Sequence, residues 1–382
     1  MTTHTNIYFA PIKNIVIPRS KKILPDQEKE NKIKGLFAES LLLGDRITIE
    51  VNGPNLVIVT LLRWLGRNNL ERLIEEGVIK FVYNPSAIAY ITLENIRAIP
   101  MHNTNPGLNR ITSPDPAWQD IFSGTSIVLG EQTGLPRADR RNIARLVGKK
   151  ALIEIEQDKI FDEICKVSKI DFCGIIGKKL GFLNVDNPDS GDIPQDMMHK
   201  YLDVAGSNSL LTVACATGCN EIVGDKTSDL ILEHRLSKIL QPAGEKIENF
   251  NQILEFHETI NIAELLDQGK ISFNDILEMR TSKGANEFRQ WLSNTGDLTP
   301  ATLLREYNER WNGLLKITKN TSFKAGKIIF YTGIGAAVCV LSPFVGIGTG
   351  LGLNILDSFF LENIVKKIWR PKIFIDQLKE KF

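Results

Sequence analysis

Residues 328–356 contain no charged side chain, and this run restricts the possible folds more than any other feature of the sequence. Glycine is frequent within it, although each glycine costs about 1 kcal/mol relative to alanine in an exposed helix. Such a composition is typical of helices whose backbones pack closely, so we expect the run to lie in a protein core or a membrane. Its six glycines are Gly333, Gly335, Gly346, Gly348, Gly350 and Gly352.

Pro343 divides the run into two parts, and neither part alone reaches the roughly 20 residues that span a bilayer. Gly346 and Gly350 have the small-xxx-small spacing of helices packed in membranes. Basic residues flank the run on both sides, which favours keeping both ends on the cytosolic side. In a membrane, the run would therefore form a re-entrant helical hairpin rather than a single span. A buried hairpin in a soluble bundle is slightly favoured over membrane insertion, because the polar side chains of Asn354 and Asp357 find hydrogen-bond partners more easily there.

The cysteine content and the first residues favour a cytoplasmic protein. Attachment at the inner face of a membrane, peripheral or re-entrant, would come from the C-terminal end of the chain. The 46 basic and 45 acidic residues nearly balance, so no global affinity for polyanions follows. Five cysteines in 382 residues do not form a disulfide framework. The first residues show no basic segment followed by an apolar one, so we expect no secretory signal.

Periodicity predicts an α+β fold. Residues Arg46–Val51 alternate polar and apolar side chains, as a half-buried strand does. Helices are expected over 56–65 and around 70–76, the second capped by Gly77, with further strands over 78–83 and 87–93. Another helix is expected from Arg137 to Val147.

After residue 225 the pattern predicts helices only, one of them carrying Ile253, Leu254 and His257 on a single face. The chain is thus expected to have an N-terminal mixed α/β domain and a predominantly helical C-terminal region that ends in the apolar hairpin. The expected divisions are a mixed α/β domain at 1–105, an α/β or α-rich middle region at 117–224, a helical region at 225–321, and the hairpin with its basic tail at 322–382.

The strongest candidate for general acid–base chemistry is the cluster of Glu255, His257 and Glu258. A general base needs a histidine beside a carboxylate. The zinc-protease pattern requires a second histidine four residues after the first, where this sequence has Asn261. Because His257 falls on the apolar face of the expected helix, a core histidine is the favoured interpretation.

Metal and cofactor signals are weak. Cys215 and Cys219 would share a helix face, but further ligands at zinc spacing are missing, so small core residues are favoured. The aspartate-rich loop near residue 190 has Pro188 where a calcium loop needs an oxygen ligand. The alternating glycines from Gly346 do not fit the dinucleotide fingerprint. We expect neither a metal nor a cofactor.

A basic stretch runs along the helix expected at Arg137 to Val147. Arginines recur every four residues and would line one face, and neighbouring cations enlarge it. Phosphate binding is the functional interpretation. A solvated helix face is favoured instead, because Asp139 interrupts the stretch and no stacking aromatic residues accompany it. The basic residues are Arg137, Arg140, Arg141, Arg145, Lys149 and Lys150.

The sequence favours a non-enzymatic sensor, scaffold or effector whose hairpin, residues 328–356, docks on or inserts into membrane lipid. A protein partner is a further expectation, and nucleic acid is a less favoured one. Two alternatives stay open: a protein- or nucleic-acid-binding module that uses the Arg137–Lys150 stretch, and a hydrolase or nuclease centred on Glu255, His257 and Glu258.

Overall fold

The computed structural model describes about half of the chain. The described residues are 5–14, 27–51, 56–83, 87–93, 97–103, 133–153, 198–219, 221–224, 252–255, 262–293, 327–330 and 372–375, with short pieces at 129, 164, 167–168, 171–172, 193–194, 228, 231, 305–306 and 309–310.

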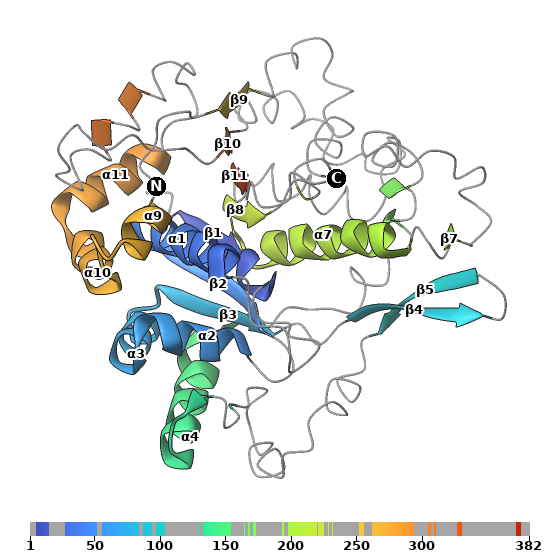
Figure 1. Cartoon of the computed structure of the whole chain (residues 1–382), viewed down its shortest axis with the longest axis horizontal. Helices are drawn as coiled ribbons and strands as arrows, with labels where there is room; N and C mark the ends of the chain where they lie inside the picture. Colours follow the sequence, from blue (N-terminus) through green and yellow to red (C-terminus); the bar gives the residue numbers. More distant parts are fainter. Residues whose placement is uncertain are drawn as a thin grey trace, which may run out of the picture.

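A mostly parallel sheet lies at the centre of the molecule (Figure 1). Its strand order is β6-β3-β2-β1-β8-β11-β10-β9. The strands are β1 (Asn6–Phe9), β2 (Arg46–Val51), β3 (Ile79–Tyr83), β6 (Leu152–Ile153), β8 (Glu221–Gly224), β9 (Gln252–Glu255), β10 (Lys327–Phe330) and β11 (Lys372–Ile375). The strands from β6 to β11 in this order run parallel, whereas β10 is antiparallel to both of its neighbours.

One face of the parallel strands is covered by helices from the N-terminal part of the chain. They are α1 (Gln27–Leu43), α2 (Leu56–Leu65), α3 (Arg67–Glu75) and α4 (Arg137–Leu146), which continues as a π-helical turn at Val147–Ala151. Ile47, Ile49 and Val51 of β2 face this layer and are fully buried. Phe37 of α1 lies at its centre, with its ring 5.4 Å from that of Phe9. The apolar side chains at every second position of β2 thus pack against the apolar face of α1.

A second group of helices packs against α1: α9 (Ile262–Asp267), α10 (Phe273–Thr281) and α11 (Lys283–Ser293). The Phe273 ring lies 6.3 Å from that of Phe37, so both groups share one core. Figure 1 shows these three helices gathered beside α1, with α4 projecting on the far side of α3.

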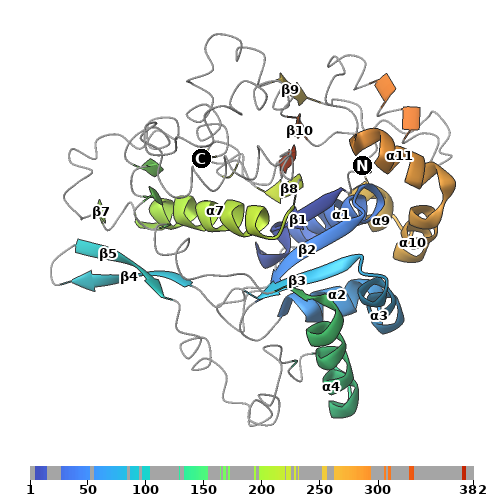
Figure 2. The ribbon, with the colours of Figure 1, turned by 180° about the vertical axis from the view of Figure 1, so that it is seen from behind.

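The longest described helix, α7 (Met198–Ala216), belongs to a different packing layer. Its buried side chains, such as Tyr201 and Val204, are not part of the core around Phe37. Tyr201 instead packs edge-to-face against Phe172 at 6.0 Å. A small second sheet, β4 (Ala87–Leu93), β5 (Arg97–Asn103) and β7 (Ile193–Pro194), contacts α7 and extends away from the central sheet, as both views show (Figure 2).

Helices and a parallel sheet together confirm an α+β character. The helices expected at 56–65 and around 70–76 are confirmed as α2 and α3, and the strand expected at Arg46–Val51 is confirmed as β2. Gly77 ends the second helix with a φ of 73°, which glycine adopts without steric cost.

The expectation of helices throughout the C-terminal region is wrong at three places. Residues 252–255 form β9 rather than a helical face carrying Ile253 and Leu254, and residues 327–330 and 372–375 form β10 and β11. These strands contain only two or three consecutive apolar residues, which fit a helix as well as a strand, so cross-strand pairing decided the outcome. The rest of the expected hairpin, residues 331–356, lies outside the described residues, and the expected domain boundaries stay predictions.

Candidate functional site

The two described residues that flank the segment 331–371 lie side by side in the central sheet. This segment contains all six glycines of the expected hairpin, and it leaves β10 at Phe330 and enters β11 at Lys372. Phe330 and Lys372 are direct partners in the antiparallel pair. Directly opposed strand residues have Cα atoms about 4.5–5.5 Å apart. The apolar segment is therefore held at both ends at one point of the fold.

These two ends emerge at the edge of the sheet where the parallel strands begin. A continuous row of paired residues crosses six strands, from Ile329 through Ile373, Ile222, Tyr8 and Thr48 to Lys80. Phe330 and Lys372 follow this row on the side of the amino ends of β1 and β2. We call this side the amino edge of the sheet.

Three cations crowd together at the far end of the same edge. Lys80 of β3 donates a hydrogen bond from Nζ to the carbonyl oxygen of Lys150 at 2.5 Å. Arg46 begins the neighbouring strand β2, and its positive charge is close enough to repel the Lys80 ammonium group. Burial lowers the pKa of Lys80, and the positive charges of Arg46 and Lys150 lower it further.

The structure divides the predicted basic stretch of α4 into two kinds of residue. Arg137, Arg145, Lys149 and Lys150 are exposed, and Arg141 is half-buried. Arg140 is buried, and its Nη1 donates to the carbonyl oxygen of Leu129 at 3.3 Å, so its expected place in a surface patch is wrong. The register of α4 turns Arg140 inward together with Ile143 and Ala144.

Asp139, which was expected to dilute the patch, has a partner on another helix. Its Oδ1 lies 2.9 Å from Nη1 of Arg67, the first residue of α3. Both side chains are about one-third exposed, so the pair is partly screened by solvent. The Arg67 guanidinium nevertheless offsets the negative charge of Asp139 within α4.

The expected acid–base cluster is only partly described. Glu255 is the last residue of β9, where it pairs with Lys327 of β10 in register. It therefore does not lie on the expected helix. His257 and Glu258 lie outside the described residues, and so do the aspartates of the loop near residue 190.

Cys219 does not share a helix face with Cys215, because α7 ends at Ala216 and Gly218 follows with a φ of 68°. Cys219 is fully buried, and its sulfur lies 3.3 Å from Oγ1 of Thr217. Burial raises the pKa of this thiol. Among the described residues no three or more His, Cys, Asp and Glu side chains cluster as metal ligands would.

Sequence reasoning missed a buried polar pair between β1 and β2. Tyr8 donates a hydrogen bond from its hydroxyl to Oε2 of Glu50 at 2.7 Å, and Glu50 is 5% exposed. Burial raises the pKa of Tyr8 well above its usual value, and the Glu50 charge raises it further. The alternation of β2 was a signal for this pair, since it puts Thr48 and Glu50 on the face away from α1.

The strand order reverses beside β1, because β2 and β3 lie on one side of it and β8 on the other. Such a reversal is where α/β sheets commonly bind ligands, at the carboxyl ends of the strands. Here the amide of Ala10 donates to the carbonyl oxygen of Val223 at 3.1 Å, which holds the two strand ends together. Residues Ala10–Asn14 contain no glycine, so the phosphate-binding loop of dinucleotide sites is missing from the sequence.

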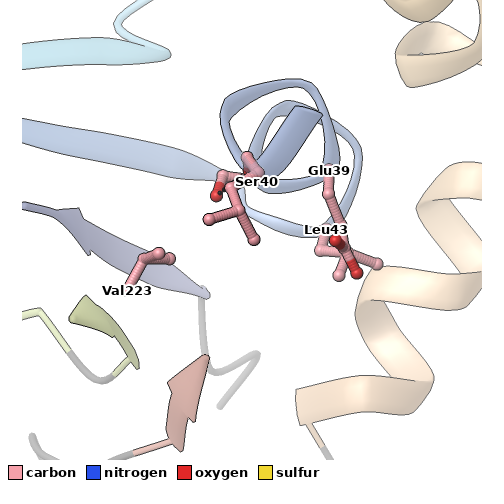
Figure 3. Close-up of a pocket in the computed structure, with 5 residues that line it drawn as sticks. Glu39, Ser40, Leu43 and Val223 are labelled. Atoms are coloured by element: carbon pink, nitrogen blue, oxygen red, sulfur yellow. Dashed lines mark hydrogen bonds between the residues drawn. The ribbon is translucent and has the colours of Figure 1, made fainter. Parts of the chain in front are cut away.

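A small hollow lies between α1 and β8 (Figure 3). Glu39, Ser40 and Leu43 of α1 line it opposite Val223, and Leu36 completes it. Ser40 donates its hydroxyl hydrogen to the carbonyl oxygen of Leu36 at 2.8 Å. The hollow has no room for a water molecule, so it is a feature of helix–sheet packing and not a ligand site.

Comparisons with known proteins identify no relative: no family model, no curated protein and no solved structure matches this chain significantly. Within the described part of the chain, no helix has both the length and the apolar character needed to cross a bilayer.

Proposed function

We propose that the chain is a non-enzymatic, membrane-docking protein of the cytoplasm, in which the α/β part holds an apolar segment that enters one leaflet of a bilayer. The observation that carries this proposal is the pairing of Phe330 with Lys372. It supports a segment that leaves the sheet and returns to the same point, and it speaks against two ends on opposite sides of a membrane.

Segment length agrees with entry into a single leaflet. Residues 331–356 remain uncharged after β10 has taken the start of the run, and Pro343 divides them near the middle. Each limb has 12 or 13 residues, which is about 18–20 Å as a helix. The hydrocarbon core is about 30 Å thick, so a hairpin of this size reaches roughly its middle.

The charges that follow the segment also support this proposal. Lys366, Lys367 and Arg370 come shortly before β11, and Trp369 is of the kind that favours the membrane interface. Each basic residue near an anionic surface contributes about 1 kcal/mol to attachment. The returning limb therefore provides both an interfacial anchor and electrostatic attraction.

Flotation of the full-length protein with vesicles tests the proposal. In one variant, residues 335–353 are replaced by a glycine–serine linker of equal length, which leaves β10 and β11 in place. In the control, the polar residues 104–116 are replaced by the same kind of linker. We expect the first variant to lose flotation and the control to keep it. The proposal would be overturned if both the full chain and the control fail to float with the vesicles.

A second measurement addresses the alternative of a soluble core, in which the first variant misfolds. A single cysteine, introduced by Ser342→Cys in a full-length chain whose five native cysteines are replaced by alanine, is labelled with a polarity-sensitive dye. Vesicles should shift its emission to shorter wavelength if the segment enters lipid. An emission spectrum that does not change with vesicles shows that the segment stays in the protein, which rejects the proposal even if both linker variants fold.

A further inference from the structure

The second site on this molecule is the cation cluster at the amino edge, which we define as Arg46, Lys80, Lys149 and Lys150. These residues come from three neighbouring strands or the turn before one: β2, β3 and the turn that precedes β6. Neighbouring strands are about 4.8 Å apart, so the cluster spans roughly 10 Å. The sequence conceals it, because Arg46 and Lys150 are separated by more than 100 residues.

The cluster places like charges close together, and this arrangement carries an electrostatic cost. The pKa of Lys80 is lowered as a result, since burial and the charges of Arg46 and Lys150 all disfavour its ammonium form. The hydrogen bond from Lys80 to the Lys150 carbonyl oxygen keeps the side chain in this position. A bound anion would relieve the repulsion among the cations and favour the charged form of Lys80.

Exposed cations continue from the cluster along α4. Arg145 and Arg137 are exposed on this helix, and Asp139 is held by Arg67. From Arg137 to Lys150 the chain rises about 20 Å as a helix. The positive surface is therefore an extended line rather than a pocket, and it fits a partner with regularly repeated negative charges.

The phosphodiester backbone of nucleic acid fits this surface better than a bilayer does. Figures 1 and 2 show α4 projecting on the opposite side of the molecule from β9, β10 and β11. Five strand-to-strand steps separate β11 from β6. A twist of about 20° per step turns their amino ends roughly 100° apart. A flat membrane that receives residues 331–371 therefore does not face the cation cluster.

We propose that Arg46, Lys80, Lys149 and Lys150 form a docking surface for the phosphodiester backbone of nucleic acid, bound without regard to base sequence. Lysine and arginine contacts to phosphates supply affinity but no sequence information. This inference is independent of the proposed membrane function, because it uses other residues on another side of the molecule.

The proposal predicts how steeply the affinity falls as the salt concentration rises. Four phosphate contacts on duplex DNA correspond to a slope of about −3.6 in a plot of log affinity against log salt concentration. A fourfold increase in salt should then weaken binding by about 150-fold. The probe is a fluorescently labelled duplex of mixed sequence, about two helical turns long, followed by anisotropy with the full-length protein.

The test variant carries Arg46→Gln, Lys80→Gln, Lys149→Gln and Lys150→Gln. A matched control removes the same charge from exposed residues elsewhere: Arg72→Gln, Lys270→Gln, Lys283→Gln and Arg305→Gln. We expect the test variant to lose at least 100-fold in affinity at low salt and the magnitude of its slope to fall by about 3.6. The control should bind like the unmodified protein, within about threefold. The double variant Lys149→Gln/Lys150→Gln, both exposed, should reduce the slope by about two if Lys80→Gln disturbs the fold.

Equal loss of affinity in test and control variants would show a general charge effect and reject the surface. The same holds if the unmodified protein does not bind the duplex at low salt. If the test variant loses flotation with anionic vesicles while the unmodified protein ignores the duplex, the partner is a membrane and the inference is wrong. The variant with residues 335–353 replaced should still bind the duplex, which separates this result from failure of the membrane proposal.

Discussion

Tyr8 on β1 donates a hydrogen bond to Glu50 on β2 at 2.7 Å, and both side chains are buried between neighbouring parallel strands. Removing the hydroxyl by Tyr8→Phe leaves the buried carboxylate without this donor. Loss of a hydrogen bond to a buried charged group costs about 2 kcal/mol. We expect urea denaturation to show that decrease, and Glu50→Gln, which keeps an acceptor oxygen, to show a smaller one. Equal stability of Tyr8→Phe and the unmodified protein contradicts this account.

The same pair predicts how stability changes in alkaline solution. Burial and Glu50 raise the pKa of Tyr8 in the folded protein. In the unfolded chain tyrosine ionises near pH 10. The folded state therefore binds more protons above about pH 10, so the stabilisation is complete below that pH and is lost as the pH rises toward the raised pKa. Unfolding free energies measured across this range should fall less steeply for Tyr8→Phe.

Arg280 from α10 is predicted to be essential for the end of α1. Its guanidinium donates to the carbonyl oxygens of Leu41, Gly44 and Asp45, the last two at 2.5 and 2.8 Å. Helix ends leave such carbonyls without partners, and a cation there is favourable. Burial, followed by the charge of Arg289, lowers the pKa of Arg280 to about 10, so the side chain still carries its charge near neutral pH.

Arg280→Met should therefore lower the unfolding free energy by about 3 kcal/mol, because three carbonyls lose a charged donor. The matched control is Arg72→Met, whose arginine is half exposed and lies 3.9 Å from Glu76. That change should cost less than about 0.5 kcal/mol. Thermal and urea denaturation of both variants measure the difference, and similar losses in the two would refute the role of Arg280.

The start of α10 supplies a further prediction. Ser272 accepts a hydrogen bond from the amide of Asp275, and the Asp275 carboxylate accepts one from the amide of Ser272 at 2.7 Å. Ser272→Ala should destabilise the protein by about 1 kcal/mol, as loss of an N-cap does.

Hydrogen bonds from Ser272 also lower the pKa of Asp275. That stabilisation is present above the unfolded pKa of about 3.9 and disappears as the pH falls through the lower folded value. The unfolding free energy of the Ser272→Ala variant should consequently fall less on acidification than that of the unmodified protein.

Local patterns predicted much of the first half of the fold. The alternation in Arg46–Val51 and the stripe formed by Leu70, Leu73 and Ile74 each specify one buried face, and both elements form as expected. The short strands β9, β10 and β11 were missed because their stability depends on partners distant in sequence. Ile329, for example, pairs with both Ile253 and Ile373.

Prediction of the sites was limited for the same reason. The cations of α4 were recognisable from their spacing, but the helical register that turns Arg140 inward depends on packing against α3. The proximity of Lys80 and Lys150 follows from strand order, which no local pattern encodes. The row of pairs that leads from Ile329 to Lys80 likewise exists only once the sheet has formed.

The position of β11 between β8 and β10 has a consequence for the order of events during protein synthesis. Residues 327–330 leave the ribosome before residues 372–375, and at about 5–20 residues per second the interval is several seconds. Throughout that interval the strand that joins β10 to β8 does not yet exist. The apolar segment is therefore synthesised with one free end, and its choice between lipid and protein surroundings can be made before the strand that fixes its second end has been translated.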